Sequence, residues 1–247
     1  MSIITLHSYR RGVGKTTCIV NLAVLMAQQG YRVGIISQHI LKLWELADVP
    51  EPEGLDATDI PHCQIPLLWP QQQSVGQLMV ILGHYHSTLD VQQMAQELEH
   101  IQHKLKLDYL FIELIKPLQS NMLSNVALCD VLILMLGLDQ TDVQHTAVIA
   151  DIAQQLGVTT TFLLMSQTPP SLDSMMLHEQ IQGICPLSRV GIFPWVPTMA
   201  LGNQDVFCLI YPDAELTQRF QGIVDQIIDV TTPLKNMLGA KSKISVN

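Results

Sequence analysis

Apolar residues along this chain recur in two alternating spacings, one typical of buried strands and one typical of helices. The run 2–7 is short and β-branched, as in a buried strand. From Lys15 onward the apolar positions recur at helical spacing until Gly30, a common helix stop, and a second strand-like run follows at 31–37. This order predicts a strand–helix–strand unit with parallel strands.

The alternation continues to residue 230 and indicates the fold class. Further strands are predicted at 107–113, 130–137, 159–166 and 188–194, and further helices at 91–106, 121–129, 141–157 and 214–230. At least six strands alternating with helices predict an α/β fold, a three-layer, doubly wound and mainly parallel sheet flanked by helices. We expect one domain over residues 1–232 and a polar, frayed C-terminal tail over 233–247.

The segment 39–106 is less regular, and five prolines fall between Pro50 and Pro70. Within it, the run Trp69–Gln77 has the composition of a turn that leads into a helix. No internal repeat and no second domain are evident.

Composition narrows the class of protein. Apolar residues make up 48% of the chain and charged residues 14%, which indicates a globular protein with a buried core. The net charge of −9 argues against a protein that coats DNA. There is no apolar run of about 18 residues and no signal-peptide pattern. The five cysteines lack metal-ligand spacing and are interpreted as reduced thiols, so we expect a cytoplasmic protein.

The candidate chemistry lies in the segment that joins the first strand to the first helix, Gly12-Val13-Gly14-Lys15-Thr16-Thr17. Glycines let backbone N–H groups turn toward phosphate oxygens, and the helix N-terminus adds favourable partial charge. In such loops the lysine reaches the β- and γ-phosphates, the first threonine binds Mg²⁺ and the second contacts the α-phosphate. The strict pattern requires a glycine where this chain has Tyr9, so a Gly-Lys turn without a ligand is the alternative.

These features together resemble the MinD/ParA family of deviant Walker-A P-loop ATPases. The family's Lys-Gly-Gly-x-Gly-Lys-Thr loop corresponds to residues 10–16 here, and "NLA" at 21–23, "LDYLFIE" at 107–113 and "IYPDAELTQ" at 210–218 are typical of the family. The resemblance covers nearly the whole chain except residues 45–100. It implies the P-loop NTPase fold, ATP or ADP with Mg²⁺ as cofactors, and a nucleotide-dependent dimer that positions intracellular cargo.

The resemblance also assigns site residues. Lys15, Arg10, Glu113 and His39 would be catalytic, and Thr16 and Glu113 would hold Mg²⁺, Glu113 from the second shell. The residues implied in nucleotide binding are Arg11, Gly12, Val13, Gly14, Lys15, Thr16, Thr17, Ser166, Pro194 and Val196.

Several positions depart from the family pattern. Arg10 replaces the lysine that crosses the dimer, and it keeps the charge in a planar fork. Arg11 replaces a glycine, at a cost of about 1 kcal/mol or more if that position needs a positive φ. Ser37, His39 and Glu113 replace family aspartates, and Ser166 replaces the asparagine that reads adenine. Trp195 is interpreted either as a residue that stacks on adenine or as core.

Two hypotheses follow. The first is a MinD/ParA-like switch with a slow ATPase, which converts ATP and water to ADP and phosphate and acts through a homodimer and a protein partner or cargo adaptor. The second is a pseudo-ATPase that serves as a binding partner or as a heterodimer subunit with an intact paralogue. Membrane or nucleic-acid docking through the lysines near the C-terminus and metal binding by His62-Cys63 or His84-Tyr85-His86 are the weaker alternatives.

Overall fold

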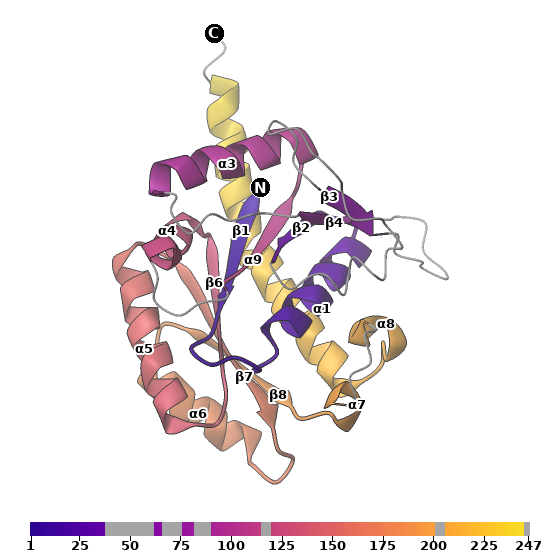
Figure 1. Ribbon diagram of the computed structural model, residues 1–247, viewed down its shortest axis with the longest axis vertical. Coiled ribbons are helices and arrows are strands. Elements are labelled where there is room, and N and C mark those ends of the chain that lie inside the picture. The colour runs from indigo at the N-terminus through magenta and orange to yellow at the C-terminus, as the bar shows by residue number, and fades with distance from the viewer. Residues whose placement is uncertain (38–61, 66–75, 82–89, 115–119, 201–205, 245–247) are drawn as a thin grey trace.

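A computed structural model describes residues 1–37, 62–65, 76–81, 90–114, 120–200 and 206–244 of the chain. Within these residues the strands form one eight-stranded sheet in the order β3-β4-β2-β5-β1-β6-β7-β8 (Figure 1). The strands are β1 Ser2–His7, β2 Arg32–Ile36, β3 His62–Ile65, β4 Gln77–Ile81, β5 Tyr109–Glu113, β6 Val131–Leu136, β7 Thr160–Thr168 and β8 Arg189–Pro194. Every pair is parallel except β3 with β4, so the predicted mainly parallel α/β sheet is confirmed.

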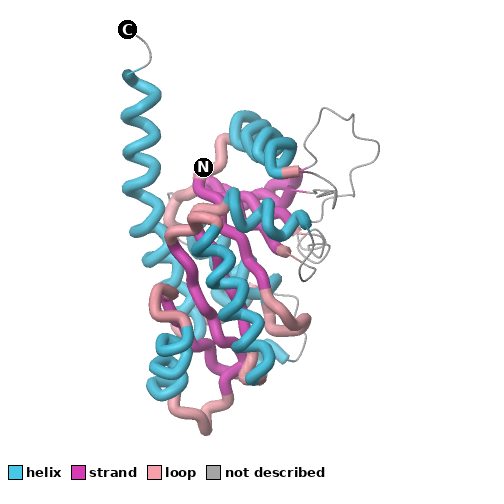
Figure 2. The backbone as a smooth tube through the Cα atoms, turned by 90° about the vertical axis from the view of Figure 1, so that its left-hand side faces the viewer, coloured by secondary structure: helices cyan, strands magenta, loops and turns pink. Residues whose placement is uncertain are grey.

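Helices cover both faces of the sheet and make three layers (Figure 2). They are α1 Lys15–Gln28, α3 Val91–Leu105, α4 Ser120–Leu128, α5 Gln140–Gln155, α6 Ser174–Ile184, α7 Pro197–Ala200, α8 Phe207–Ile210 and α9 Glu215–Ile244. One core cluster packs α1, α8 and α9 against the sheet, and the other packs α3, α4, α5 and α6 against the opposite face. The central strands are therefore buried on both sides, as expected of parallel strands.

Local sequence signals account for several helix ends. Asp90 caps α3 in a reciprocal pair of hydrogen bonds with Gln93, and Asp139 caps α5 through the backbone N–H groups of Thr141 and Asp142. Gly30 and Gly157 follow α1 and α5 with positive φ angles, as the sequence predicts.

Five of the described elements are absent from the sequence prediction, and two of them are the short helices α7 and α8. The run Trp69–Gln77 was expected to lead into a helix, but Gln77 begins strand β4, whose residues 78–81 are buried in the core. Strand β3 has four residues and lies at the sheet edge, too short to show a pattern. Helix α6 lies near the other edge of the sheet, where Ile181 is its buried residue and Leu177 packs against the same core.

Helix α9 continues to Ile244, through the segment that the sequence predicts to be a frayed tail. Figure 2 shows its C-terminal end extending beyond the rest of the fold. The domain boundary at residue 232 stays a prediction. None of the helices in the described part of the chain combines the length and the apolar character needed to cross a membrane.

The topology gathers the candidate residues at one edge of the sheet. Strands β2, β5, β1, β6 and β7 are neighbours in that order and run parallel, so their carboxyl ends meet at the same edge. In open α/β sheets this edge is where ligands bind.

Candidate functional site

The loop between β1 and α1 owes its shape to two left-handed glycines. Gly12 has φ 80° and Gly14 has φ 86°, and a Cβ added to either would meet nothing within 4 Å. The glycines are therefore required by the backbone angle and not by packing. Arg11 does not take a positive φ, so the strain considered for it from the sequence does not arise.

The first turn of α1 opens onto this loop. Gly14 is its N-cap and supplies no side-chain hydrogen bond, and the first turn carries no acidic residue. The N–H groups at the start of a helix have no partner within the helix. Their partial positive charge suits an anion, and phosphate fits this position.

Lys15 places a cation inside the loop. Its side chain is buried, and its Nζ donates a hydrogen bond to Ser8 Oγ at 2.8 Å. Burial lowers the pKa of Lys15 below its ordinary value, and Arg11 lowers it further, whereas Glu113 and Asp142 oppose the shift. An anion in the loop would favour the charged lysine and relieve this cost of burial.

Thr16 meets a carboxylate directly beneath the loop. Its Oγ1 donates a hydrogen bond of 2.7 Å to Oε1 of Glu113, which ends β5, and Ser37 Oγ at the end of β2 donates to Oε2 of the same side chain. The family resemblance implies an aspartate at this position, and the longer glutamate side chain of this chain also meets the Thr16 hydroxyl. Hydroxyl and carboxylate oxygens are the ligands that Mg²⁺ prefers, so this donor set fits the ion. His39 lies outside the described residues.

Two contacts at the mouth of the loop join it to α5. The rings of Tyr9 and His145 are stacked with centroids 3.8 Å apart and planes 13° apart. Arg10 forms an ion pair with Asp139 at 3.0 Å, and both side chains are exposed. Hydrogen bonds from the backbone, led by that of Thr141, lower the pKa of Asp139, and Arg10 lowers it further. The sequence gives no role to Asp139 or His145, because no local pattern brings α5 to the loop.

The end of β7 contacts the back of the loop. Ser166 Oγ donates a hydrogen bond of 2.8 Å to the carbonyl oxygen of Val13, and Gln167 Nε2 donates one of 2.9 Å to that of Gly12. Pro194 of β8 lies opposite Thr168 in the sheet, and Val196 packs against the core on the α1 side. A role for Ser166, Pro194 and Val196 in holding a base stays a prediction. Trp195 is half-exposed and outside the core.

His7 is a buried group at the site that the sequence does not indicate. It ends β1, and neither ring nitrogen has a hydrogen-bond partner. Burial lowers the pKa of His7 to about 4, and the charge of Lys15 contributes in the same direction. The imidazole is therefore neutral at neutral pH and adds no positive charge next to Lys15.

The described residues contain no group of three or more potential metal ligands. The side chains of His62 and Cys63, and the run His84-Tyr85-His86, lie outside the part whose side chains are described. The four described cysteines, Cys18, Cys129, Cys185 and Cys208, are free thiols, as predicted.

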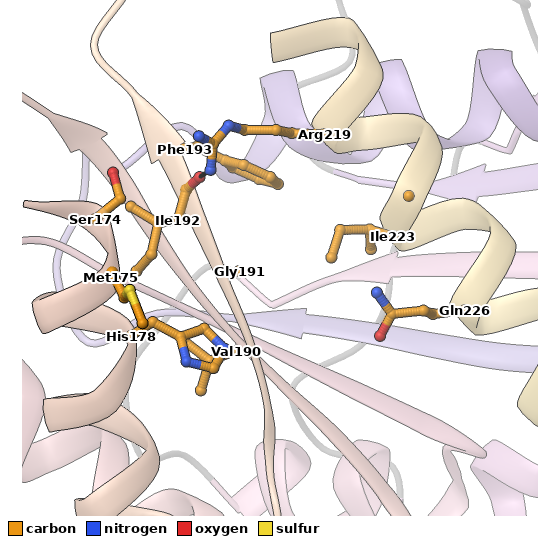
Figure 3. Close-up of a pocket in the computed structure, with 11 residues that line it drawn as sticks. Ser174, Met175, His178, Val190, Gly191, Ile192, Phe193, Arg219, Ile223 and Gln226 are labelled. Atoms are coloured by element: carbon orange, nitrogen blue, oxygen red, sulfur yellow. Dashed lines mark hydrogen bonds between the residues drawn. The ribbon is translucent and has the colours of Figure 1, made fainter. Parts of the chain in front are cut away.

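A cavity of about 370 Å³ lies elsewhere, between α6, β8 and α9 (Figure 3). Arg219 reaches across it from α9 and donates a hydrogen bond of 2.7 Å to the carbonyl oxygen of Ile192. This bond covers part of the exposed edge of β8. None of the predicted site residues lines the cavity.

Comparison with solved structures places the fold. MinD from Aquifex aeolicus superposes with a TM-score of 0.68 at 14% identity, over 93% of this chain and 97% of that one. The fold is that of the MinD/ParA ATPases.

Other neighbours agree with this fold. The Mg-ADP complex of MinD from Pyrococcus horikoshii has a TM-score of 0.66 at 16% identity, over 92% of this chain and 95% of that one. The ATP complex of a Cyanothece McdA variant has a TM-score of 0.63 at 16% identity, over 95% of this chain and 96% of that one. No family model and no curated protein sequence matches the chain. The MinD/ParA-like architecture is therefore visible in the backbone and in short motifs, and not in overall sequence similarity.

Proposed function

We propose that this chain is a divergent MinD/ParA-like protein that binds ATP or ADP with Mg²⁺ in the loop over residues 10–17. The observation that carries the proposal is the hydrogen bond between Thr16 and Glu113 beneath a loop shaped by two left-handed glycines. The loop can thus surround an anion, and the Thr16 hydroxyl and the Glu113 carboxylate beneath it offer two hard oxygen donors to a metal ion. Structural neighbours include a MinD bound to Mg-ADP and an McdA variant bound to ATP, which supports the same cofactors here.

Each residue would contribute through its charge or its backbone. Lys15 and the uncapped start of α1 would hold the phosphates, and Thr17 continues this first turn. Thr16 would hold Mg²⁺ directly, and Glu113 would hold it through a water molecule. The bound ion would neutralise part of the phosphate charge. Arg10 and Arg11 add further positive charge near the loop.

We infer that bound nucleotide switches the protein between partner states for positioning or partitioning in the cytoplasm. The active form would be a homodimer, or a heterodimer with an intact paralogue, and it would act through a protein partner or cargo adaptor. A MinC:MinD complex among the structural neighbours supports a protein partner in general terms.

Hydrolysis of ATP to ADP and phosphate should be slow. Phosphoryl transfer depends on charge neutralisation and on correct positioning of the attacking water. Lys15 and Thr16 would provide the charge neutralisation. The attacking water would be poorly positioned, because Ser37 presents a hydroxyl where the family has a carboxylate and that hydroxyl is hydrogen-bonded to Glu113. The same observation favours the second candidate, a pseudo-ATPase that binds nucleotide and assembles with a partner without turnover.

The test combines calorimetric titration of Mg-ATP, phosphate release and sedimentation with and without nucleotide. We expect binding by the wild-type chain, loss of binding in Lys15→Met, and unchanged binding in Lys104→Met, which alters an exposed lysine on α3. Turnover above background supports the slow switch ATPase, whereas tight binding with background turnover supports the pseudo-ATPase. A wild-type chain that binds neither Mg-ATP nor Mg-ADP would refute both.

A further inference from the structure

Gln167 has an unusual backbone conformation at the end of β7. Its φ is 57°, and Gln167 and Lys106 are the non-glycine residues with positive φ in the described part of the chain. Glutamine is not among the residues that adopt this region readily, so the conformation is strained. Strain at a site commonly accompanies a functional constraint, and the contacts of Gln167 identify that constraint.

The strain coincides with an irregularity in the sheet. The pairing of β7 with β8 shifts register between Met165 and Thr168. Bulges of this kind re-aim a side chain out of its regular alternation. The Gln167 amide thereby reaches back to the phosphate loop and donates to Gly12 O, while the preceding Ser166 donates to Val13 O.

These two bonds fix two consecutive peptide groups of the loop. A peptide group is planar and trans, so its N–H points opposite to its C=O. With Gly12 O and Val13 O both held toward β7, the N–H groups of Val13 and Gly14 face the other way. Successive backbone N–H groups turned to one side form an anion-binding concavity.

We infer that Gln167 and Ser166 are positioning residues of the phosphate loop, which orient the Val13 and Gly14 amides toward the polyphosphate. This inference rests on the proposed nucleotide binding and names the part of the nucleotide that these residues serve. It adds a second role for Ser166 beside the predicted contact with the base, because the Ser166 hydroxyl donates a hydrogen bond to the loop.

The test is a comparison of three ligands, Mg-ATP, Mg-GTP and inorganic triphosphate with Mg²⁺, titrated calorimetrically. Gln167→Gly relieves the left-handed strain and removes the amide, so the variant should fold. Loss of one hydrogen bond should weaken all three ligands by a common factor of roughly 3 to 10. Ser166→Ala should do the same. Lys106→Gly is the matched control, because it relieves a left-handed residue at the C-terminus of α3 and should leave all three affinities unchanged.

A loss confined to Mg-ATP would show that Gln167 reads adenine and would overturn the inference, as would unchanged affinity for all three ligands. Nuclear magnetic resonance of the ligand-free protein provides a second readout. In Gln167→Gly the amide resonances of Val13 and Gly14 should shift, and in Lys106→Gly they should not. If the wild-type chain binds no ligand, the proposed function fails, and the amide resonances still decide whether Gln167 orients the loop.

Discussion

Replacement of Gly14 by alanine tests the backbone of the loop with no steric complication. Gly14 has φ 86°, and an added Cβ would meet nothing within 4 Å. The effect of Gly14→Ala should therefore come from the left-handed conformation alone, which costs an L-residue about 1–2 kcal/mol. For a domain of this size, each kcal/mol lowers the melting temperature by roughly 2–4 °C, so we expect a decrease of about 2–8 °C.

Strain that the variant avoids by relaxing its loop should appear in binding instead of in melting. If the alanine variant relaxes the loop in the free protein, a ligand must restore the left-handed conformation, and affinity falls by at most the strain. This corresponds to a loss of up to about 5- to 30-fold for Mg-ATP.

Two other glycines are matched controls for Gly14→Ala. Gly157 has φ 88° and equally open surroundings, but it follows the C-terminus of α5, roughly 24 Å along that 16-residue helix from its loop-facing end. Gly157→Ala should melt lower by a similar amount and bind Mg-ATP normally. Gly222 lies within α9 in open space and has no positive φ, so Gly222→Ala should raise stability by about 0.5–1 kcal/mol.

Melting curves by circular dichroism and calorimetric titration of all three variants decide the outcome. If Gly14→Ala both melts and binds Mg-ATP like the wild type, the loop does not require a left-handed residue, and the reasoning is refuted. Equal loss of affinity in Gly157→Ala would show that the binding effect reflects general destabilisation.

Three further predictions concern charges at the site. Asp139→Asn keeps a capping side chain on α5 but releases Arg10 from its ion pair. Mg-ATP should therefore bind more tightly, by roughly fivefold or less in low salt, and the gain should fade in high salt. Tighter binding that is independent of salt would contradict this. Glu113→Gln removes the carboxylate that accepts a hydrogen bond from Thr16, so ATP binding should depend less on Mg²⁺. The ratio of the ATP affinity measured with Mg²⁺ to that measured with a chelator should fall toward one. An unchanged ratio would place the ion elsewhere. The pKa of His7 is lowered to about 4 in the folded protein, so between pH 6.5 and 4 the unfolded chain binds more protons than the folded chain. The free energy of unfolding, measured by urea titration, should therefore decrease by on the order of 3 kcal/mol as the pH falls from 6.5 to 4. His7→Thr should flatten that part of the pH profile, and an identical profile would show that another group titrates.

The fold and the centre of the loop could be predicted because their signals are local. Apolar periodicity fixes where strands and helices lie, and Gly12, Gly14, Lys15 and Thr16 follow one another in the chain. The resemblance to the MinD/ParA family implied that Thr16 and Glu113 lie together, and the hydrogen bond between them agrees with that expectation.

The supports of the loop could not be predicted in the same way. Ser166 is 153 positions from Val13, and Asp139 is 129 positions from Arg10. Such contacts depend on a bulge in β7 and on the placement of the first turns of α5, and neither has a sequence pattern of its own. The local motif shows which strand end Ser166 occupies, but it does not show that the Ser166 hydroxyl donates to the loop.

The two kinds of support differ in how firmly they hold the loop. The bond from Ser166 is buried, and water cannot compete with it, whereas the Arg10–Asp139 pair is exposed and screened by salt. The centre of the loop should therefore keep its shape before any ligand arrives, while the Arg10–Asp139 pair at its mouth separates at little cost in free energy. A polyphosphate entering from the mouth would compete with Asp139 for Arg10 without disturbing Val13. We accordingly expect salt to change the affinity of the loop mainly through Arg10, and substitutions at β7 to change it equally at all salt concentrations.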